Sequence, residues 1–291
     1  MKLSDIYIRD PFILPYRGIY YMYGKIELND TRFVVYTSTD LDNWSEPKVV
    51  FDPNDDFWGT KDYWAPEVHE YKGKMYMLAS FKAEGKCRGT HVLVADDPMG
   101  MFRPISTKPA TPIDWECLDG TLYVDKNSIP YIVFCHEWLQ IGNGTVCYAQ
   151  LSEDLSSAVS EPVVMFSAHD FPFVHSLYKE RESYVTDGPF LYRSTADELL
   201  LIWSSFCKSM GNGYFVNVLK SDNGEITGKW EPQNMLFDEH GGHGMLFRTF
   251  EDELKLAIHR PNSPSGAERA CLISVYENEW GLRTNGNQDR E

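Results

Sequence analysis

The stretch Asp10-Pro11-Phe12-Ile13-Leu14 is the first of five copies of one short pattern. In each copy a small or charged residue stands beside Gly or Pro and is followed by an alternating apolar run. The copies begin at Asp10, Ala65, Asp119, Asp187 and His243. These residues lie 55, 54, 68 and 56 positions apart, and a period of this length is typical of repeats that close into a ring. We therefore expect the five positions to converge on one axis.

Each repeat contains further segments with the period-2 alternation and the aromatic or β-branched residues of strands. In the first repeat these segments cover residues 18–23, 33–38 and 49–51. A unit of about four antiparallel strands hides both of its faces only by packing against neighbouring units. The sequence predicts an all-β, five-bladed β-propeller that forms a single domain over residues 1–291. A two-sheet sandwich would not explain the period.

The composition limits the possible partners. The formal net charge of −16 has the wrong sign for binding nucleic acid or an anionic membrane, whereas a neutral sugar tolerates it. No apolar run of about 18 residues is present, so we expect no transmembrane segment.

The expected compartment follows from two further observations. The first ten residues contain no apolar segment typical of a signal peptide. The six cysteines match no CxxC metal pattern and are interpreted as reduced, mostly buried thiols. We expect a cytoplasmic protein, or a secreted or periplasmic one if a signal peptide has been removed.

Three of the five leading residues are aspartates, namely Asp10, Asp119 and Asp187. At the heads of the innermost strands, their side chains are expected to point into one funnel. Carboxylates crowded in this way cannot all ionise freely, so at least one keeps its proton beside a charged neighbour. A carboxylic acid that protonates a leaving oxygen and a carboxylate that activates water are the groups that glycoside hydrolysis needs.

These motifs, with Trp64-Ala65-Pro66-Glu67, Gly242-His243-Gly244 and Ile258-His259, resemble glycoside hydrolase family 43 over nearly the whole chain. Members of this family are five-bladed propellers that act on arabinose- and xylose-containing glycans. The resemblance implies an inverting hydrolase that requires no cofactor. In it Asp10 is the general base, Asp119 holds and tunes the acid, and Asp187 is the general acid.

One position departs from the family pattern. The family's acid is usually Glu before Gly-Pro, whereas this chain has Asp187. Aspartate is shorter than glutamate by one methylene. Its carboxyl group therefore lies further from the leaving oxygen unless the backbone of the strand is closer to the substrate. Glu137, at the end of the strand after Asp119, is the alternative acid.

Sugar recognition needs flat apolar faces and fixed hydrogen bonds. Trp64, Trp138 and Phe206 are expected to line the funnel. Glu67 and Glu137 are the expected polar contacts.

The resemblance also assigns substrate contacts to His243, His259 and Arg269. Arg269 would hydrogen-bond a substrate hydroxyl or fix Asp10 by its charge. The family's histidine at the position of His243 lies near a central cation held mostly by waters, so a structural Ca²⁺ is expected there.

Two other functions remain open. A retaining, fructosidase-type propeller would use Asp10 as nucleophile and Glu116, in the motif Trp115-Glu116-Cys117, as acid. A non-catalytic glycan-binding propeller would explain the shortened Asp187. In every case the expected partner is an oligosaccharide or polysaccharide, and the sugar, endo or exo action and the oligomeric state stay open.

Overall fold

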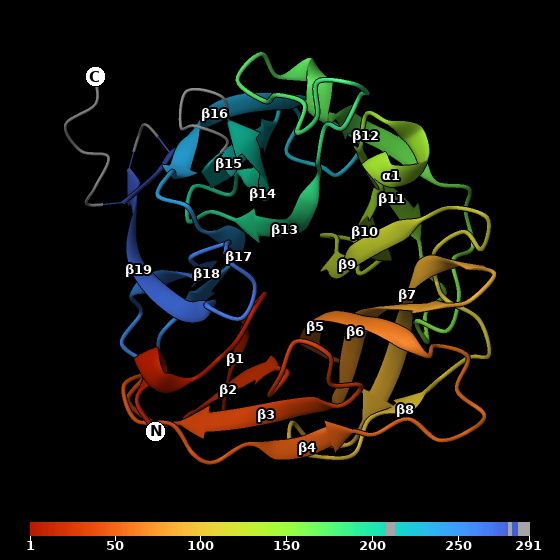
Figure 1. Cartoon of the computed structure of the whole chain (residues 1–291). Helices are drawn as coiled ribbons and strands as arrows, with labels where there is room; N and C mark the ends of the chain where they lie inside the picture. The colour runs from red at the N-terminus through yellow and green to blue at the C-terminus, as the bar shows by residue number, and fades with distance from the viewer. Residues whose placement is uncertain (208–212, 279–280, 285–291) are drawn as a thin grey trace.

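The computed structural model describes residues 1–207, 213–278 and 281–284, so residues 285–291 of the predicted domain lie outside the described part. Within these residues the strands form five antiparallel sheets of four strands each, arranged in a ring around a common axis (Figure 1). This confirms the predicted five-bladed β-propeller with four antiparallel strands per blade.

Each blade is a meander in which hydrogen-bonded neighbours follow one another along the chain. The strands are, for blade 1, β1 (Phe12–Tyr16), β2 (Ile19–Gly24), β3 (Phe33–Ser38) and β4 (Lys48–Phe51); for blade 2, β5 (Lys61–Tyr71), β6 (Lys74–Ala83), β7 (Lys86–Ala95) and β8 (Arg103–Pro104); for blade 3, β9 (Cys117–Val124), β10 (Pro130–His136), β11 (Thr145–Gln150) and β12 (Val163–Ser167); for blade 4, β13 (Asp187–Arg193), β14 (Leu199–Cys207), β15 (Gly213–Ser221) and β16 (Trp230–Phe237); and for blade 5, β17 (Gly242–Arg248), β18 (Leu254–Arg260), β19 (Arg269–Asn278) and β20 (Gly281–Thr284).

Helical structure in the described residues is limited to short turns. These are the 3₁₀ turns η1 (Leu3–Asp5) and η2 (Ala168–Asp170) and one α-helical turn, α1 (Trp138–Ile141). None of the helices in the described ranges has the length and apolar character needed to cross a bilayer.

The core lies between neighbouring blades, because alternation along the strands gives each sheet two apolar faces. At the contact of blades 3 and 4, Trp203 is fully buried, with its ring 5.1 Å from Phe166 and 5.4 Å from Phe171. A second cluster joins blades 4 and 5, where Ile202 and Leu256 are both fully buried. Packing between blades therefore fixes the ring and the positions of the inner strands.

The N-terminal segment closes the ring between blades 5 and 1. Tyr7 pairs with Arg269 in an isolated antiparallel bridge, and the Ile8 amide donates to the Glu268 carbonyl at 3.4 Å. The terminal ammonium donates to the Trp44 carbonyl at 2.6 Å. These contacts anchor the chain just before it enters β1.

Candidate active site

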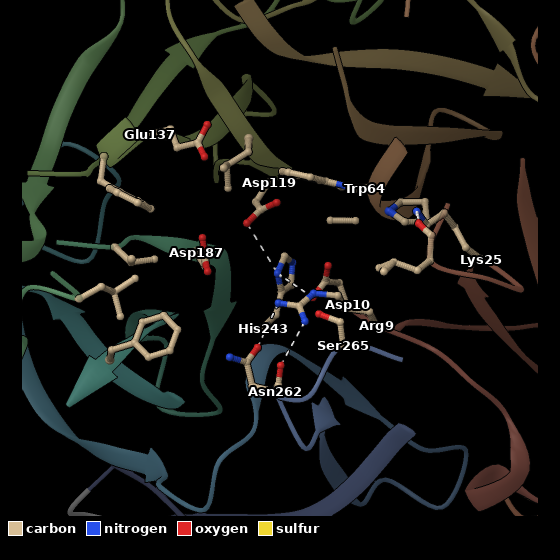
Figure 2. A pocket seen from close by; sticks show the side chains of 18 of the residues that line it. Arg9, Asp10, Lys25, Trp64, Asp119, Glu137, Asp187, His243, Asn262 and Ser265 are labelled. Carbon is tan, nitrogen blue, oxygen red and sulfur yellow. Dashed lines mark hydrogen bonds and ion pairs between the residues drawn. The ribbon is translucent and has the colours of Figure 1, made fainter. Parts of the chain in front are cut away.

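A cavity of about 400 Å³ lies at the end of the axis where the five inner strands begin (Figure 2). Every blade contributes a side chain from the head of its inner strand or from just before it: Asp10, Trp64, Asp119, Asp187 and His243. The three aspartates selected from the sequence therefore line one cavity.

The heads of the inner strands share an unusual backbone conformation. Ala65, Asp119, Gly188 and His243 have φ values of 45° to 55°, and each lies at a register shift in its ladder. Asp10 has the same conformation, with φ of 54°. A bulge whose residue lies in the left-handed region turns the strand and re-aims the side chain. The repeat seen in the sequence is thus a repeated backbone bulge.

The fourth blade departs from the predicted alignment by one residue. Gly188, and not Asp187, occupies the left-handed position of the bulge. A Cβ on Gly188 would lie 2.8 Å from the ring of His243, so a larger residue does not fit there. Asp187 precedes the bulge, as Trp64 does in blade 2. The predicted equivalence of Asp187 with the other two aspartates is therefore wrong, although its side chain reaches the same cavity.

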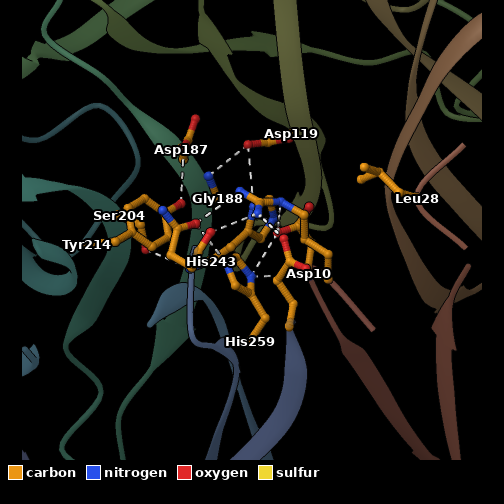
Figure 3. A network of polar contacts seen from close by, with 12 residues as sticks. Asp10, Leu28, Asp119, Asp187, Gly188, Ser204, Tyr214, His243 and His259 are labelled. Carbon is orange, nitrogen blue, oxygen red and sulfur yellow. Dashed lines mark hydrogen bonds and ion pairs between the residues drawn. The ribbon is translucent and has the colours of Figure 1, made fainter. Parts of the chain in front are cut away.

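Asp10 is surrounded by groups that favour its charged form (Figure 3). Its Oδ1 lies 3.0 Å from Nδ1 of His259 and 3.2 Å from Nδ1 of His243, with Nε of Arg9 at 3.8 Å. Burial favours the neutral acid, but these neighbours outweigh it and hold the pKa of Asp10 well below its usual range. Asp10 also lines the cavity. An ionised carboxylate in this position is suited to take a proton from water.

Asp119 is held from both its backbone and its side chain. Its amide donates to the Ser80 hydroxyl at 2.9 Å, and its Oδ2 accepts the Gly188 amide at 3.0 Å. Nδ1 of His243 lies 3.6 Å from this oxygen. Burial and the charge of Asp10 raise the pKa of Asp119 well above its usual range. Asp119 is therefore held firmly in place beside Asp10 and Asp187.

Asp187 has a different set of neighbours. Its Oδ2 accepts a hydrogen bond of 3.0 Å from the Tyr214 hydroxyl. Burial, followed by repulsion from Asp119, raises the pKa of Asp187 to about 7, against the opposing effects of His243 and Tyr214. A carboxyl group that stays protonated near neutral pH and lines a cavity is suited to protonate a leaving oxygen.

Glu137, the alternative acid, also lines the cavity and is 5% exposed. Its Oε2 accepts a hydrogen bond from Nη1 of Arg88. Burial raises the pKa of Glu137 to about 7, although the positive charge of Arg88 opposes the shift. Two carboxyl groups of the cavity therefore have raised pKa values in this range, and their hydrogen-bond partners distinguish them.

The three aromatic residues proposed from the sequence, Trp64, Trp138 and Phe206, line the cavity. The guanidinium of Arg88 lies 4.0 Å from the centre of the Trp64 ring. Trp138 begins α1, and its ring centroid is 5.9 Å from that of Tyr178. The cavity therefore combines apolar ring surfaces with carboxyl groups, as sugar sites do.

Three residues proposed as substrate contacts lie outside the cavity lining: Glu67, His259 and Arg269. Glu67 is 6% exposed and pairs with a neighbouring histidine. His259 is fully buried against Asp10, which it orients. The Arg269 guanidinium donates to two backbone carbonyls of residues 266–268, at 3.3 and 2.8 Å. Their positions do not support direct contacts with a ligand in this cavity.

Glu116, the acid of the retaining alternative, also lies outside the cavity lining. It accepts hydrogen bonds from Nζ of Lys82 at 2.5 Å and from the Arg88 amide at 2.8 Å. Burial opposes ionisation, but these contacts outweigh it and lower the pKa of Glu116. An ionised carboxylate outside the cavity is poorly suited to protonate a leaving group.

The cation expected near His243 has no direct ligand set. Nδ1 of His243 faces Asp10 and Asp119 instead. In the part of the chain that the structure describes, no group of three or more His, Cys, Asp or Glu side chains is arranged to hold a metal ion. Ca²⁺ takes about six to eight oxygen ligands. The side chains present do not fit Ca²⁺ as direct ligands, and a cation held through water molecules stays a prediction.

Three residues that hold the carboxyl groups were missed in the sequence: Arg9, Arg88 and Tyr214. Arg9 directly precedes Asp10, so the first repeat did contain a signal for it. Arg88 and Tyr214 lie within β7 and β15, where the strand pattern carries no sign of a tertiary partner.

Comparisons with known proteins agree with this geometry. The sequence matches the profile of glycosyl hydrolases family 43 over residues 5–276. An endo-arabinase from Bacteroides thetaiotaomicron VPI-5482 is 36% identical, with a TM-score of 0.90 over 96% of this chain and 98% of that chain.

More distant structures share the fold. A thermostable family-43 glycoside hydrolase is 23% identical, with a TM-score of 0.81 over 96% of this chain and 93% of that chain. An endo-1,4-beta-xylanase from the same Bacteroides strain is 24% identical, with a TM-score of 0.78 over 96% and 94%. No curated protein sequence matches significantly. Because the family profile spans most of the sequence, the chain belongs to glycosyl hydrolase family 43.

Proposed function

We propose that the protein hydrolyses arabinose-containing polysaccharides by a single displacement that inverts the anomeric centre. The observation that carries the proposal is that Asp10 and Asp187 line one cavity in opposite surroundings, Asp10 beside two histidine nitrogens and Asp187 beside the Tyr214 hydroxyl and a second carboxyl group. The pKa of Asp10 is held below its usual range, and that of Asp187 is raised to about 7. A general base and a general acid are thereby available together at neutral pH.

The proposed reaction uses these groups in one step. Asp10 takes a proton from a water molecule, whose oxygen attacks the anomeric carbon. Asp187 gives its proton to the glycosidic oxygen as that bond breaks. Asp119 accepts a hydrogen bond from the Gly188 amide and thereby keeps the bulge next to Asp187 in place. Exchange with solvent then restores the proton of Asp187 and removes that of Asp10.

Hydrogen bonding supports Asp187 over Glu137 as the acid. Asp187 accepts its hydrogen bond from the neutral hydroxyl of Tyr214, which favours the carboxylate less strongly than a cation does. Glu137 instead pairs with the cation Arg88, which favours the carboxylate. We therefore assign the leaving-group proton to Asp187 and give Glu137 a role in binding.

The substrate class rests on the apolar rings of the cavity and on the 36% identical endo-arabinase. Aryl α-L-arabinofuranosides and linear arabinan are the first substrates to test, with xylose-based substrates as the runner-up. Proton NMR of the first-formed sugar should show the anomer opposite to that of the substrate. Retention of configuration would favour the double-displacement alternative, and tight binding of arabinan without turnover would favour a glycan-binding protein.

A further inference from the structure

Arg88 is buried directly behind the cavity wall without lining the cavity itself. Its side chain, on β7, is 5% exposed. Nη1 donates to Glu137, and Nη2 donates to Oδ2 of Asp62 at 3.0 Å. The guanidinium also lies 4.0 Å from the centre of the Trp64 ring. One cation therefore joins β5 of blade 2 to the residue that precedes α1 in blade 3.

The geometry of this contact requires arginine. A planar guanidinium can stack on an indole face while its two nitrogens point to two separate carboxylates, whereas the ammonium of lysine is a single point charge. Asp62 is presented by a bulge, with φ of 54°, in the register shift between Lys61 and Trp64. A left-handed aspartate is costly, so the surrounding contacts hold it in this conformation.

Two of the three residues that Arg88 contacts, Trp64 and Glu137, belong to the cavity lining. Trp64 and Glu137 line the cavity beside Asp119, as Figure 2 shows. With one face of the indole covered by Arg88, the remaining surface of Trp64 is available to a sugar ring. With Oε2 of Glu137 bonded to Arg88, Oε1 is the oxygen that can accept a sugar hydroxyl.

We propose that Arg88 is a positioning residue for substrate binding, which holds Trp64 and Glu137 together as one wall that receives a sugar unit. The inference rests on the proposed function, because it takes the ligand to be a neutral polysaccharide. Arg88 itself does not touch the substrate. Its contribution is the fixed orientation of two groups that do.

The test compares Arg88→Lys with a matched variant of a second arginine that also donates hydrogen bonds to two side chains. Arg248 donates to Glu277 at 2.6 Å and to Tyr192 at 3.0 Å, away from the cavity lining. We expect Arg88→Lys to raise KM for arabino-oligosaccharides about tenfold with kcat nearly unchanged, since it removes uniform binding. Arg248→Lys should leave KM unchanged, even if both variants lower Tm.

A double-variant cycle and a second variant complete the test. Glu137→Gln should raise KM to a similar extent, and combining it with Arg88→Lys should add little, because residues that act as one unit are non-additive. If Arg88→Lys does not fold, Asp62→Asn, which alters the other carboxylate partner of Arg88 outside the cavity lining, should give a rise in KM in the same direction. An unchanged KM in the folded variant, or additive effects in the double variant, would overturn the inference. Absence of turnover in the parent protein would instead refute the proposed function.

Discussion

The heads of β1 and β13 place a carboxyl group in the same cavity, yet the two groups have opposite properties. Asp10 lies 3.0 and 3.2 Å from two histidine nitrogens, and its pKa is held below its usual range. Asp187 receives one hydroxyl hydrogen bond, and burial with repulsion from Asp119 raises its pKa to about 7. Both residues are aspartates, so their neighbours, and not their chemistry, separate a base from an acid.

The largest expected effect comes from removing the base. Asp10→Asn keeps the shape of the side chain but cannot accept a proton, so we expect kcat to fall about 10³-fold with binding retained. Product release from arabino-oligosaccharides measures kcat, and titration calorimetry measures binding. Asp96→Asn, at an exposed position outside the cavity, is the control. An Asp10→Asn variant that keeps more than about a tenth of the parent kcat would contradict the assignment.

Removing the acid should give a smaller and more selective loss. Asp187→Asn should lower kcat about 10²-fold on oligosaccharides, whose leaving oxygen needs a proton. The loss should nearly disappear for a dinitrophenyl glycoside, whose leaving group departs as an anion. Rates on both substrates check this pattern. If Glu137→Gln gave the selective loss and Asp187→Asn did not, the acid would be Glu137.

A change at Tyr214 should shift the pH profile. Its hydroxyl donates to Asp187 and favours the carboxylate, so Tyr214→Phe should raise the pKa of Asp187 further above about 7. Asp187 then keeps its proton to higher pH, and the alkaline limb of the kcat profile moves to higher pH. Tyr276→Phe, at an exposed position on β19, should leave the limb in place. A downward shift in Tyr214→Phe would contradict the arrangement.

The smallest expected effect is on stability. The pKa of Asp187 rises from 3.8 to about 7 on folding, so the folded state binds this proton more tightly than the unfolded state. The resulting stabilisation is complete below pH 3.8 and is lost as the pH rises through about 7. Asparagine does not ionise, so the variant Asp187→Asn does not lose this stabilisation. The Tm of the variant minus the Tm of the parent should therefore be about 4 °C larger at pH 8 than at pH 4. An equal Tm difference at both pH values would show that the shift is absent.

The fold could be predicted because its signals are local. Alternation and turn residues revealed the inner strands, and the period revealed their number. The bulge at the head of each inner strand was not readable, since both Asp187 and Gly188 fit a turn. This is why the alignment of blade 4 was wrong by one residue.

The site was predicted only where its residues head the repeats. Asp10, Asp119 and Asp187 were found in this way. Tyr214 and Arg88 act through contacts with residues 27 and 49 positions away. A single sequence does not indicate which of its distant residues come into contact. For the same reason His259 was interpreted as a ligand contact, although it packs behind Asp10.

Direct titration of the two carboxyl groups tests the central claim. Carbon-13 NMR of protein labelled at the aspartate carboxyl carbons can be assigned with Asp10→Asn and Asp187→Asn. The signal absent from Asp187→Asn should titrate near 7, and the signal absent from Asp10→Asn should titrate below the usual range of aspartate. If the order were reversed, or if both groups titrated near 3.8, the division into base and acid would be wrong.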